Sequence, residues 1–210
     1  SLLPQATYNN GRYVSLGLIG TGGFSKVFLV RDTTNNQMMA LKKISKMLLK
    51  GEEQSLVLDN VLAEKKILIE VNSPFIINFT HSFQDERNLY FVMEYCKGGS
   101  LSKYLREQRY FEEPLARFYL CEIVMGLKAL HDENQVIYRD LKPDNIVIDQ
   151  DGHAMLTDFG LSKEGVSDHM AAKSFCGSVA YLAPEMIKRS GHGKAVDWYL
   201  LGVVLYEMLV

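Results

Sequence analysis

The chain has 210 residues, a net charge of −2 at pH 7 and 47% hydrophobic residues, an ordinary composition for a folded globular protein. The small net charge gives no reason to expect nucleic acid or a membrane surface as a partner. The three cysteines, Cys96, Cys121 and Cys176, are scattered and odd in number, which fits a reducing compartment better than a disulfide framework or a zinc site.

Alternating apolar and polar residues predict three strands early in the chain, over residues 12–19, 26–31 and 37–44. A glycine-rich loop, Gly20-Thr21-Gly22-Gly23-Phe24-Ser25, separates the first strand from the second. Glycine lets a backbone approach phosphate groups without a side chain in the way. The loop opens a strand rather than a helix, so it does not fit the dinucleotide-binding motif of oxidoreductases.

The middle of the chain is expected to contain a helix over residues 56–71, two strands over 76–83 and 89–94, and a second helix over 114–131. Glu64 in the first helix can be read as one more solvated acid. The second helix carries an apolar stripe that we expect in the core, namely Leu115, Phe118, Tyr119, Ile123, Leu127 and Leu130. His131 is expected to be a helix-end histidine, because no second His or Cys at metal spacing accompanies it.

A polar loop with Arg139, Asp140, Lys142 and Asn145 follows this helix. The next apolar residues, 146–148 and 154–157, flank a turn, so they predict a hairpin with Asn145 at its entrance and Asp158 at its exit. Phosphoryl transfer needs these groups: a carboxylate for the hydroxyl proton, two oxygen ligands for magnesium and a cation on the moving phosphate. The alternative is a polar loop that merely satisfies backbone groups.

The order and spacing of these motifs resemble those of the eukaryotic protein kinases. The catalytic segment H-R-D-L-x-x-x-N and the D-F-G motif are matched by residues 138–145 and 158–160. The glycine loop also matches, with Ser25 in place of the third glycine and Val27 two residues later. Further matches are Ala40-Leu41-Lys42 on the third strand and Ala183-Pro184-Glu185. Tyr138 in place of histidine and Ser174-Phe175-Cys176-Gly177-Ser178 look typical of the AGC group.

This resemblance implies an α+β fold of two lobes, with an antiparallel-sheet small lobe and a mainly helical large lobe. It implies a lead-in over residues 1–12 and a kinase domain over 13–210, with a small lobe over about 13–94, a hinge over about 94–99 and a partial large lobe over 100–210. The chain opens at Ser1 and stops inside an apolar run at Val210, so we expect both ends to be cut. That run is too short and interrupted to span a bilayer.

The resemblance also implies roles for single residues. Asp140 is the base or hydroxyl-orienting group, and Lys142 steadies the γ-phosphate. Lys42, paired with Glu64, holds the α- and β-phosphates. The implied magnesium ligands are Asn145 and Asp158. The implied ATP-binding residues are Ile19, Gly20, Thr21, Gly22, Gly23, Phe24, Ser25, Lys26, Val27, Ala40, Lys42, Met93, Glu94, Cys96 and Val147.

The expected function is ATP- and Mg²⁺-dependent phosphorylation of protein serines and threonines in intracellular signalling. The resemblance implies substrates with basic upstream residues, which Asp144 is expected to recognise. Ser100 stands where cyclic-nucleotide-dependent kinases carry a glutamate, so the preference for basic residues is expected to be weaker than in those kinases. Ser174 is expected to be a regulatory phosphorylation site for an upstream kinase, although it can also be read as a plain loop serine. No nucleic acid or membrane span is expected, and the location is cytoplasmic with the nucleus as a second possibility.

A pseudokinase, either a nucleotide-binding or a purely scaffolding domain, is the competing hypothesis. It predicts the loss of at least one of Lys42, Asp140, Asn145 and Asp158, and all four are present.

Overall fold

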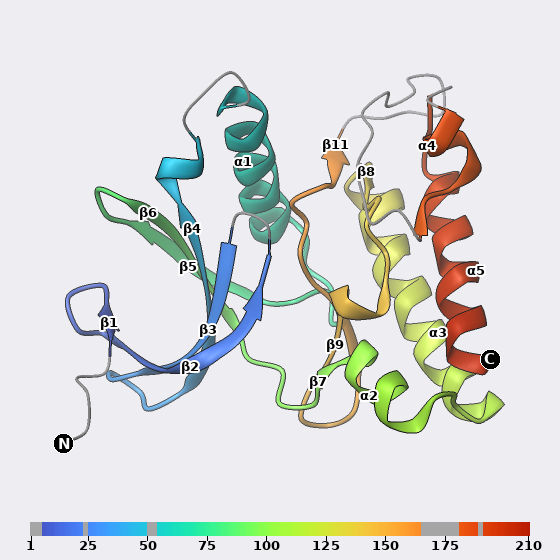
Figure 1. Ribbon diagram of the computed structural model, residues 1–210, viewed down its shortest axis with the longest axis horizontal. Coiled ribbons are helices and arrows are strands. Elements are labelled where there is room, and N and C mark those ends of the chain that lie inside the picture. The colour runs from blue at the N-terminus through green and yellow to red at the C-terminus, as the bar shows by residue number, and fades with distance from the viewer. Residues whose placement is uncertain (1–5, 23–24, 50–53, 165–180, 189–190) are drawn as a thin grey trace. The chain divides into compact units, whose positions relative to one another are not determined.

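The computed structural model describes residues 6–22, 25–49, 54–164, 181–188 and 191–210 (Figure 1). The chain divides into two compact units, the first made of Ser1–Asp59 and Asn78–Tyr95 and the second of Asn60–Ile77 and Cys96–Val210. Helix α1, Gln54–Glu70, begins in the first unit and continues in the second. The lobe and hinge bounds derived from the sequence stay a prediction.

The first unit is built on a six-stranded antiparallel sheet with the strand order β1-β2-β3-β4-β6-β5 (Figure 1). Its strands are β1 Thr7–Tyr8, β2 Tyr13–Thr21, β3 Ser25–Asp32, β4 Met38–Ser45, β5 Phe79–Gln84 and β6 Asn88–Glu94, with the short helix η1 at Lys46–Leu49. The predicted strand over 76–83 begins only at Phe79. The physical reason is that Ile77 donates its amide to Leu156 O of the second unit over 2.9 Å and so leaves the sheet.

One face of this sheet carries a hydrophobic core made of alternate residues on neighbouring strands. The buried members are Tyr13, Val30, Leu41, Tyr90 and Val92, with Tyr8, Phe28, Met39 and Phe83 packed against them. The rings of Phe83 and Tyr90 stack with centroids 4.6 Å apart. Burial of each large side chain contributes about 1.5–3 kcal/mol, so this face stabilises the unit.

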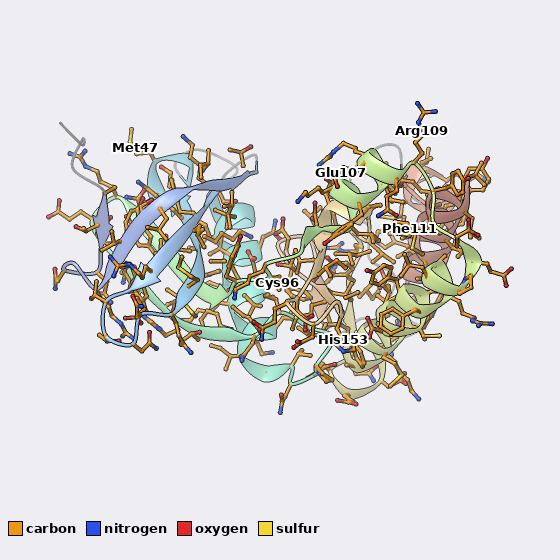
Figure 2. All side chains as sticks on the ribbon, turned by 90° about the horizontal axis from the view of Figure 1, so that it is seen from below. Met47, Cys96, Glu107, Arg109, Phe111 and His153 are labelled. Atoms are coloured by element: carbon orange, nitrogen blue, oxygen red, sulfur yellow. The ribbon has the colours of Figure 1, made fainter. Side chains whose placement is uncertain are left out.

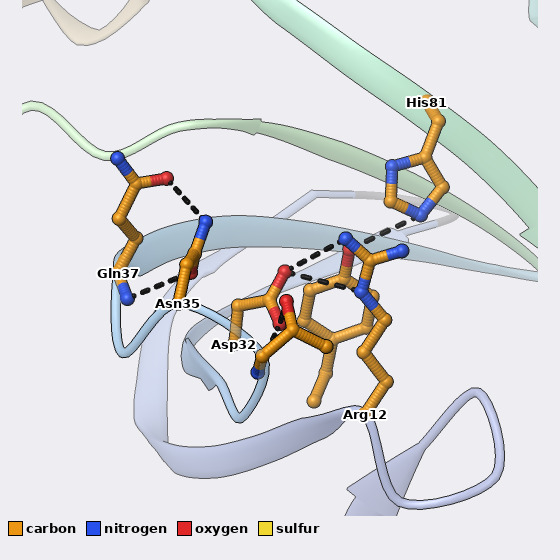
Figure 3. A network of polar contacts seen from close by, with 7 residues as sticks. Arg12, Asp32, Asn35, Gln37 and His81 are labelled. Atoms are coloured by element: carbon orange, nitrogen blue, oxygen red, sulfur yellow. Dashed lines mark hydrogen bonds and ion pairs between the residues drawn. The ribbon is translucent and has the colours of Figure 1, made fainter.

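An ion pair closes the end of the sheet where β2 begins and β3 ends (Figure 3). Arg12 donates Nε and Nη2 to Asp32 Oδ2 over 3.1 and 2.9 Å. Burial alone raises the pKa of Asp32, but hydrogen bonds from Arg12 and Thr34 outweigh it and lower that pKa to about 2. Beneath Arg12, the buried Tyr13 hydroxyl hydrogen-bonds His81 Nε2 over 3.1 Å.

The second unit is mainly helical and carries two small antiparallel sheets. Besides the continuation of α1, its elements are β7 Gly99–Ser100, α2 Leu101–Gln108, α3 Glu113–Lys128, η2 Ala129–Glu133, β8 Val136–Ile137, η3 Pro143–Asn145, β9 Ile146–Ile148, β10 Ala154–Leu156, β11 Lys163–Glu164, α4 Pro184–Lys188 and α5 Ala195–Leu209. No helix within the described ranges is both long and apolar enough to cross a membrane.

Helix α3 packs against both α5 and β10. Its residues Tyr119, Ile123 and Leu127 are buried as predicted, whereas the expectation for Leu115 and Phe118 is wrong, since these are 37% and 43% exposed. The apolar stripe is broader than the face that α5 and β10 cover. The first-turn Leu115 and the flanking Phe118 therefore remain at the surface.

The turn between α2 and α3 was not predicted. Arg109 ends α2 with φ at +72° and donates its amide to Leu105 O over 2.8 Å. Its side chain points away from the protein, while the buried Phe111 donates its amide to Met208 O of α5 over 2.6 Å (Figure 2). This bond anchors the connection to the far end of α5.

Candidate active site

Asp140 stands at the centre of a buried polar cluster in the predicted catalytic loop. Lys142 Nζ donates to Asp140 Oδ2 over 2.7 Å, and Asn145 Nδ2 donates to the same oxygen over 2.8 Å. Asn145 Nδ2 also reaches the main-chain oxygen of Asp140 over 2.9 Å. The short helix η3 creates this geometry, because it turns the chain between Pro143 and Asn145 so that both side chains return to one carboxylate.

Asp140 is only 7% exposed. Burial raises the pKa of Asp140, and the hydrogen bonds from Lys142 and Asn145 oppose that rise only in part. A carboxyl group with a raised pKa and a cation within hydrogen-bonding distance can accept or orient a proton. The sequence predicted these three residues, and the structure brings them together.

Asp197, the third residue of α5, holds the backbone that precedes Asp140. Its Oδ1 accepts the amide of Arg139 over 2.7 Å and its Oδ2 accepts the amide of Tyr138 over 2.8 Å. His131 Nε2 donates to the same Oδ2 over 2.7 Å, and Asp197 is fully buried. Arg139 has φ at +67°, a conformation that non-glycine residues adopt at an energetic cost. The hydrogen bonds to Asp197 offset that cost.

The predicted hairpin is confirmed. Strands β9 and β10 pair antiparallel, with Ile148 opposite Ala154 and Ile146 opposite Leu156. The ladder continues toward the loop, since the Thr157 amide donates to Asn145 O over 3.0 Å. Asn145 and Asp158 therefore flank the open end of one hairpin, as the sequence predicted.

The segment after the hairpin is fixed by the fully buried Tyr138 and Phe159. The Tyr138 hydroxyl donates to Thr157 O, and its ring packs against Phe159 with centroids 5.4 Å apart. Burial raises the pKa of Tyr138 well above its usual value. Asp158, between these anchors, has φ at +59° and an exposed side chain. The tyrosine in the usual histidine position thus supports the backbone on which Asp158 stands.

Glu64 is buried, at 3% exposure, so its interpretation as a solvated acid is wrong. It lies on the part of α1 that belongs to the second unit, and a Cβ built on Gly160 would lie 3.6 Å from Glu64 Oε2 and 3.5 Å from Asp158 Oδ1. Glu64 therefore lies beside the Asp158–Gly160 turn. Its predicted pairing with Lys42 joins the two units and stays a prediction.

In the first unit, strand register gathers the predicted nucleotide-binding residues on one face of the sheet. Gly20, Val27 and Lys42 form one row across β2, β3 and β4. Ala40 lies opposite Met93 in another row, two residues along β4 from Lys42. Because side chains alternate along a strand, both rows lie on the same face, opposite to the hydrophobic core.

Gly22 and Ser25 approach each other closely at the end of the β2–β3 ladder. The Gly22 amide donates to Ser25 O over 2.8 Å, and a Cβ on Gly22 would lie 3.1 Å from Ser25 Oγ. Thr21 pairs with Lys26 at the end of the ladder, and the preceding Ile19 is 47% exposed. The other predicted residues of this loop, Gly23 and Phe24, lie outside the described residues, as does the predicted phosphorylation site Ser174.

The predicted hinge runs from β6 into β7. The Glu94 amide donates to Asn78 O over 2.9 Å, and Cys96 O accepts the Gly99 amide over 3.2 Å. The adenine contacts that the resemblance implies for Glu94 and Cys96 stay a prediction. Val147, half-buried on β9, pairs with Ser100 of β7 in the second unit.

Only glycine fits at position 98 in this segment. A Cβ on Gly98 would lie 2.7 Å from Ile148 O and 2.8 Å from Ile148 Cβ. The close approach allows the Gly98 amide to donate to that same oxygen over 3.0 Å. The chain is thereby joined to β9, the strand that follows Asn145.

The sequence analysis did not predict the supporting roles of three residues. These are Asp197, which accepts hydrogen bonds from the catalytic loop, His131, which is the buried partner of Asp197, and Glu122. Glu122 Oε1 accepts His153 Nδ1 over 2.6 Å and Oε2 accepts the Ala154 amide over 2.8 Å. Glu122 interrupts the apolar face of α3, and a charged residue among buried positions is the signal that could have revealed it.

Comparison with known proteins identifies the class. The family described as protein kinase domain matches residues 13–210. The chain therefore belongs to the protein kinase domain family, and the predicted α+β fold, with an antiparallel sheet and a mainly helical part, is confirmed.

Its relatives include a probable serine/threonine-protein kinase of Dictyostelium discoideum, 42% identical over 96% of this chain and 43% of that protein. Ribosomal protein S6 kinase beta of Caenorhabditis elegans is 44% identical over 92% of this chain and 35% of its own length. Serine/threonine-protein kinase Sgk2 of Homo sapiens is 44% identical over 92% of this chain and 52% of its own length. The predicted likeness to the AGC group is confirmed. The chain spans about a third to a half of these relatives.

Proposed function

We propose that this protein transfers the γ-phosphate of ATP to serine and threonine hydroxyls of protein substrates. The observation that carries the proposal is the convergence of Lys142 Nζ and Asn145 Nδ2 on Asp140 Oδ2, at 2.7 and 2.8 Å. This convergence supports the proposal, because a carboxylate and a cation meet in one loop. The names of the relatives as serine/threonine-protein kinases support the same reaction.

Each residue has a role in this reaction. Asp140 orients the substrate hydroxyl and accepts its proton, and Lys142 neutralises charge on the γ-phosphate. Lys42, oriented by Glu64, holds the α- and β-phosphates. The transition state of phosphoryl transfer is loose and spreads charge over the phosphate oxygens, so rate enhancement comes mainly from positioning and charge neutralisation.

The donor set near the hairpin suits Mg²⁺. Asn145 Nδ2 donates to Asp140, which leaves Oδ1 as the amide atom able to bind a cation. Asp158 adds a carboxylate, and Mg²⁺ prefers oxygen ligands while keeping several waters. Two protein ligands are therefore sufficient. When bound together with ATP, Mg²⁺ neutralises charge on the β- and γ-phosphates.

The preferred substrates carry basic residues upstream of the target, but with a softer selectivity than in cyclic-nucleotide-dependent kinases. Asp144, exposed and directly before Asn145, offers a carboxylate at the edge of the catalytic loop. Ser102 Oγ donates to Asp144 Oδ1 over 2.7 Å, and Ser100 Oγ lies 2.9 Å from Ser102 Oγ. The hydroxyl of Ser102 already donates to one oxygen of the Asp144 carboxylate, and Ser100 adds no second negative charge. Both features are expected to weaken the attraction of a basic substrate residue.

Ser174 is proposed as an activating site for an upstream kinase. It lies between Asp158 and Glu185 in the sequence, and the cation of Arg139 is suited to a phosphate carrying about −1.5 to −2 charge. A cytoplasmic location, with the nucleus as the alternative, is proposed from the scattered cysteines.

The test is Asp158→Asn in the full-length protein. Removal of one metal-binding charge is expected to slow transfer from [γ-³²P]ATP to a Ser/Thr peptide library about a thousandfold. Asp151→Asn makes the same change of charge in the exposed hairpin turn and leaves turnover unaltered. Equal turnover in Asp158→Asn and wild type would refute the proposal. A wild-type protein that binds ATP and transfers nothing would support a pseudokinase instead.

A further inference from the structure

The turn between β1 and β2 contains the only Asn-Gly dipeptide of the sequence, Asn10-Gly11. Asn10 and Gly11 have φ at +53° and +86°, and the Arg12 amide donates to Asn9 O over 3.1 Å, so the chain reverses direction here. Asn-Gly is preferred in tight hairpin turns because both central residues need a positive φ. Both residues are exposed to solvent.

An Asn-Gly pair carries a reactivity of its own. The main-chain nitrogen of Gly11 can attack the side-chain carbonyl carbon of Asn10. A C–N bond forms, the nitrogen gives up its proton to the departing amide group, and that group leaves as ammonia. Water then opens the cyclic succinimide at either carbonyl, which gives aspartate or isoaspartate. Glycine favours the attack because it has no side chain to hinder the approach.

The contacts around the turn leave these groups available. Within the described residues, no hydrogen bond involves the side chain of Asn10 or the amide of Gly11. A Cβ built on Gly11 would have no atom within 4 Å, so the turn is open on that side. Strand β1 has two residues and forms the edge of the sheet. Such a short edge strand opens at low free energy, and opening frees the nitrogen to attack.

Asn36 provides an internal comparison. It lies in the turn between β3 and β4, has φ at +62° and is exposed, like Asn10. The next residue is Gln37, whose side chain hinders the attack, and Asn36 Oδ1 accepts Arg31 Nη1 over 3.3 Å. The two asparagines therefore share exposure and backbone conformation but differ in the residue that follows.

We propose that Asn10 is a site of spontaneous deamidation and isomerisation, and that this modification releases β1 from the first unit. Isoaspartate adds a methylene group to the backbone of the turn, so β1 loses its register with β2. Either product also places a carboxylate two residues before Arg12. There it competes with Asp32 for the guanidinium group that closes this end of the sheet (Figure 3).

Tyr8 is the residue through which β1 contacts the hydrophobic core of the sheet. Its ring centroid lies 5.9 Å from that of Phe28 and 5.5 Å from that of Tyr90. Just before the strand, Ala6 O accepts the Ser15 amide over 2.8 Å. Release of β1 uncovers this part of the core and breaks the bond to Ser15, so the modification has a measurable structural effect.

The first experiment ages the full-length protein in mildly alkaline buffer and follows its peptides by mass spectrometry. Enzymatic methylation of isoaspartyl carboxylates detects the isomer. Asn10 is expected to convert while Asn36 in the same sample keeps its amide. Asn10→Gly is the control, because glycine adopts a positive φ freely and has no amide to lose, so methylation should disappear. No conversion at Asn10, or conversion at Asn36 at the same rate, overturns the assignment.

The second experiment separates modified from unmodified protein by ion exchange and compares their amide hydrogen exchange by NMR. The Ser15 amide is expected to exchange at least about fivefold faster in the modified form, because its hydrogen bond to Ala6 is lost. Amides of β4, in the middle of the sheet, should stay equally protected in both forms. Equal exchange at Ser15 overturns the release of β1. Neither readout involves ATP or phosphoryl transfer, so neither depends on the proposed function.

Discussion

Two helices of the second unit each direct one carboxylate at the backbone of a neighbouring segment, α5 with Asp197 and α3 with Glu122. Asp197 accepts the amides of Tyr138 and Arg139 together with His131 Nε2. All of these contacts are buried, and the side chains of His131 and Asp197 are 3% and 0% exposed. The catalytic loop therefore depends on a carboxylate that water does not reach.

Glu122 makes the corresponding contacts nearer the surface. It accepts the Ala154 amide and His153 Nδ1, and the side chain of His153 is 53% exposed. Water can replace part of this arrangement if it opens, but it cannot replace the contacts of Asp197 without unfolding the loop. The same combination of carboxylate, amide and imidazole is thus rigid in one place and adjustable in the other. The rigid contacts of Asp197 therefore lie directly before Asp140, whereas the adjustable contacts of Glu122 lie at the turn end of the hairpin.

The largest effect is expected from Asp197→Asn. The amide side chain has one acceptor oxygen for three donors, and its NH₂ group faces donors in a buried place. Disruption of such a buried network typically costs about 3–5 kcal/mol of unfolding free energy. Denaturant unfolding of wild type and variant measures this loss, and the rate of phosphoryl transfer is expected to fall with it.

Asp132→Asn is the matched control, because Asp132 is exposed and adjacent to His131. Its unfolding free energy should stay within about 0.5 kcal/mol of wild type. If Asp197→Asn is as stable and as active as this control, the buried carboxylate does not anchor the catalytic loop.

A smaller effect is expected from Glu122→Gln. The glutamine oxygen can still accept one of the two donors, so the loss should be about 1–2 kcal/mol. Hydrogen exchange should accelerate at the Ala154 amide, while the Tyr138 and Arg139 amides stay protected. Glu113→Gln, an exposed position on the same helix, provides the control. Faster exchange in the catalytic loop than in the hairpin would reverse the proposed ranking of the two anchors.

The smallest effect concerns pH. A hydrogen bond to Glu122 and the charge of that residue raise the pKa of His153 above its unfolded value. Stability from this pair is therefore fully present below the unfolded pKa of about 6.5 and is lost as pH rises through the higher folded pKa. In His153→Gln, the decline of stability as the pH rises above about 6.5 should flatten. Parallel stability curves for the two proteins would show that the pair does not couple to folding.

Much of the active site was predictable, because its residues are close in the sequence. Asp140, Lys142 and Asn145 lie within one short loop, and the hairpin that brings Asp158 near it has clear apolar runs around a turn. Local spacing fixes such geometry. The shared face of Val27, Ala40 and Lys42 was predictable for the same reason, since register follows from alternation along β3 and β4.

The anchors were not predictable in the same way. Asp197 is more than fifty residues from Tyr138, and nothing in its local pattern indicates that it contacts backbone amides. Glu122 meets Ala154 from a different element, 32 residues away. The burial of Glu64 likewise depends on tertiary packing. Helical periodicity also overestimated the core on α3, because it cannot tell which part of an apolar stripe a neighbour covers.

The central claim, that the cluster around Asp140 serves phosphoryl transfer, is tested most directly by single-turnover kinetics of Asp140→Asn in the full-length protein. The rate of γ-phosphate transfer to a serine peptide is measured at saturating ATP, and ATP affinity is measured separately. The account predicts a rate at least about a hundredfold slower, because general base catalysis is lost. ATP affinity should change less than about threefold, since Asp140 contacts the substrate hydroxyl rather than the nucleotide. An unchanged single-turnover rate would contradict the role assigned to Asp140.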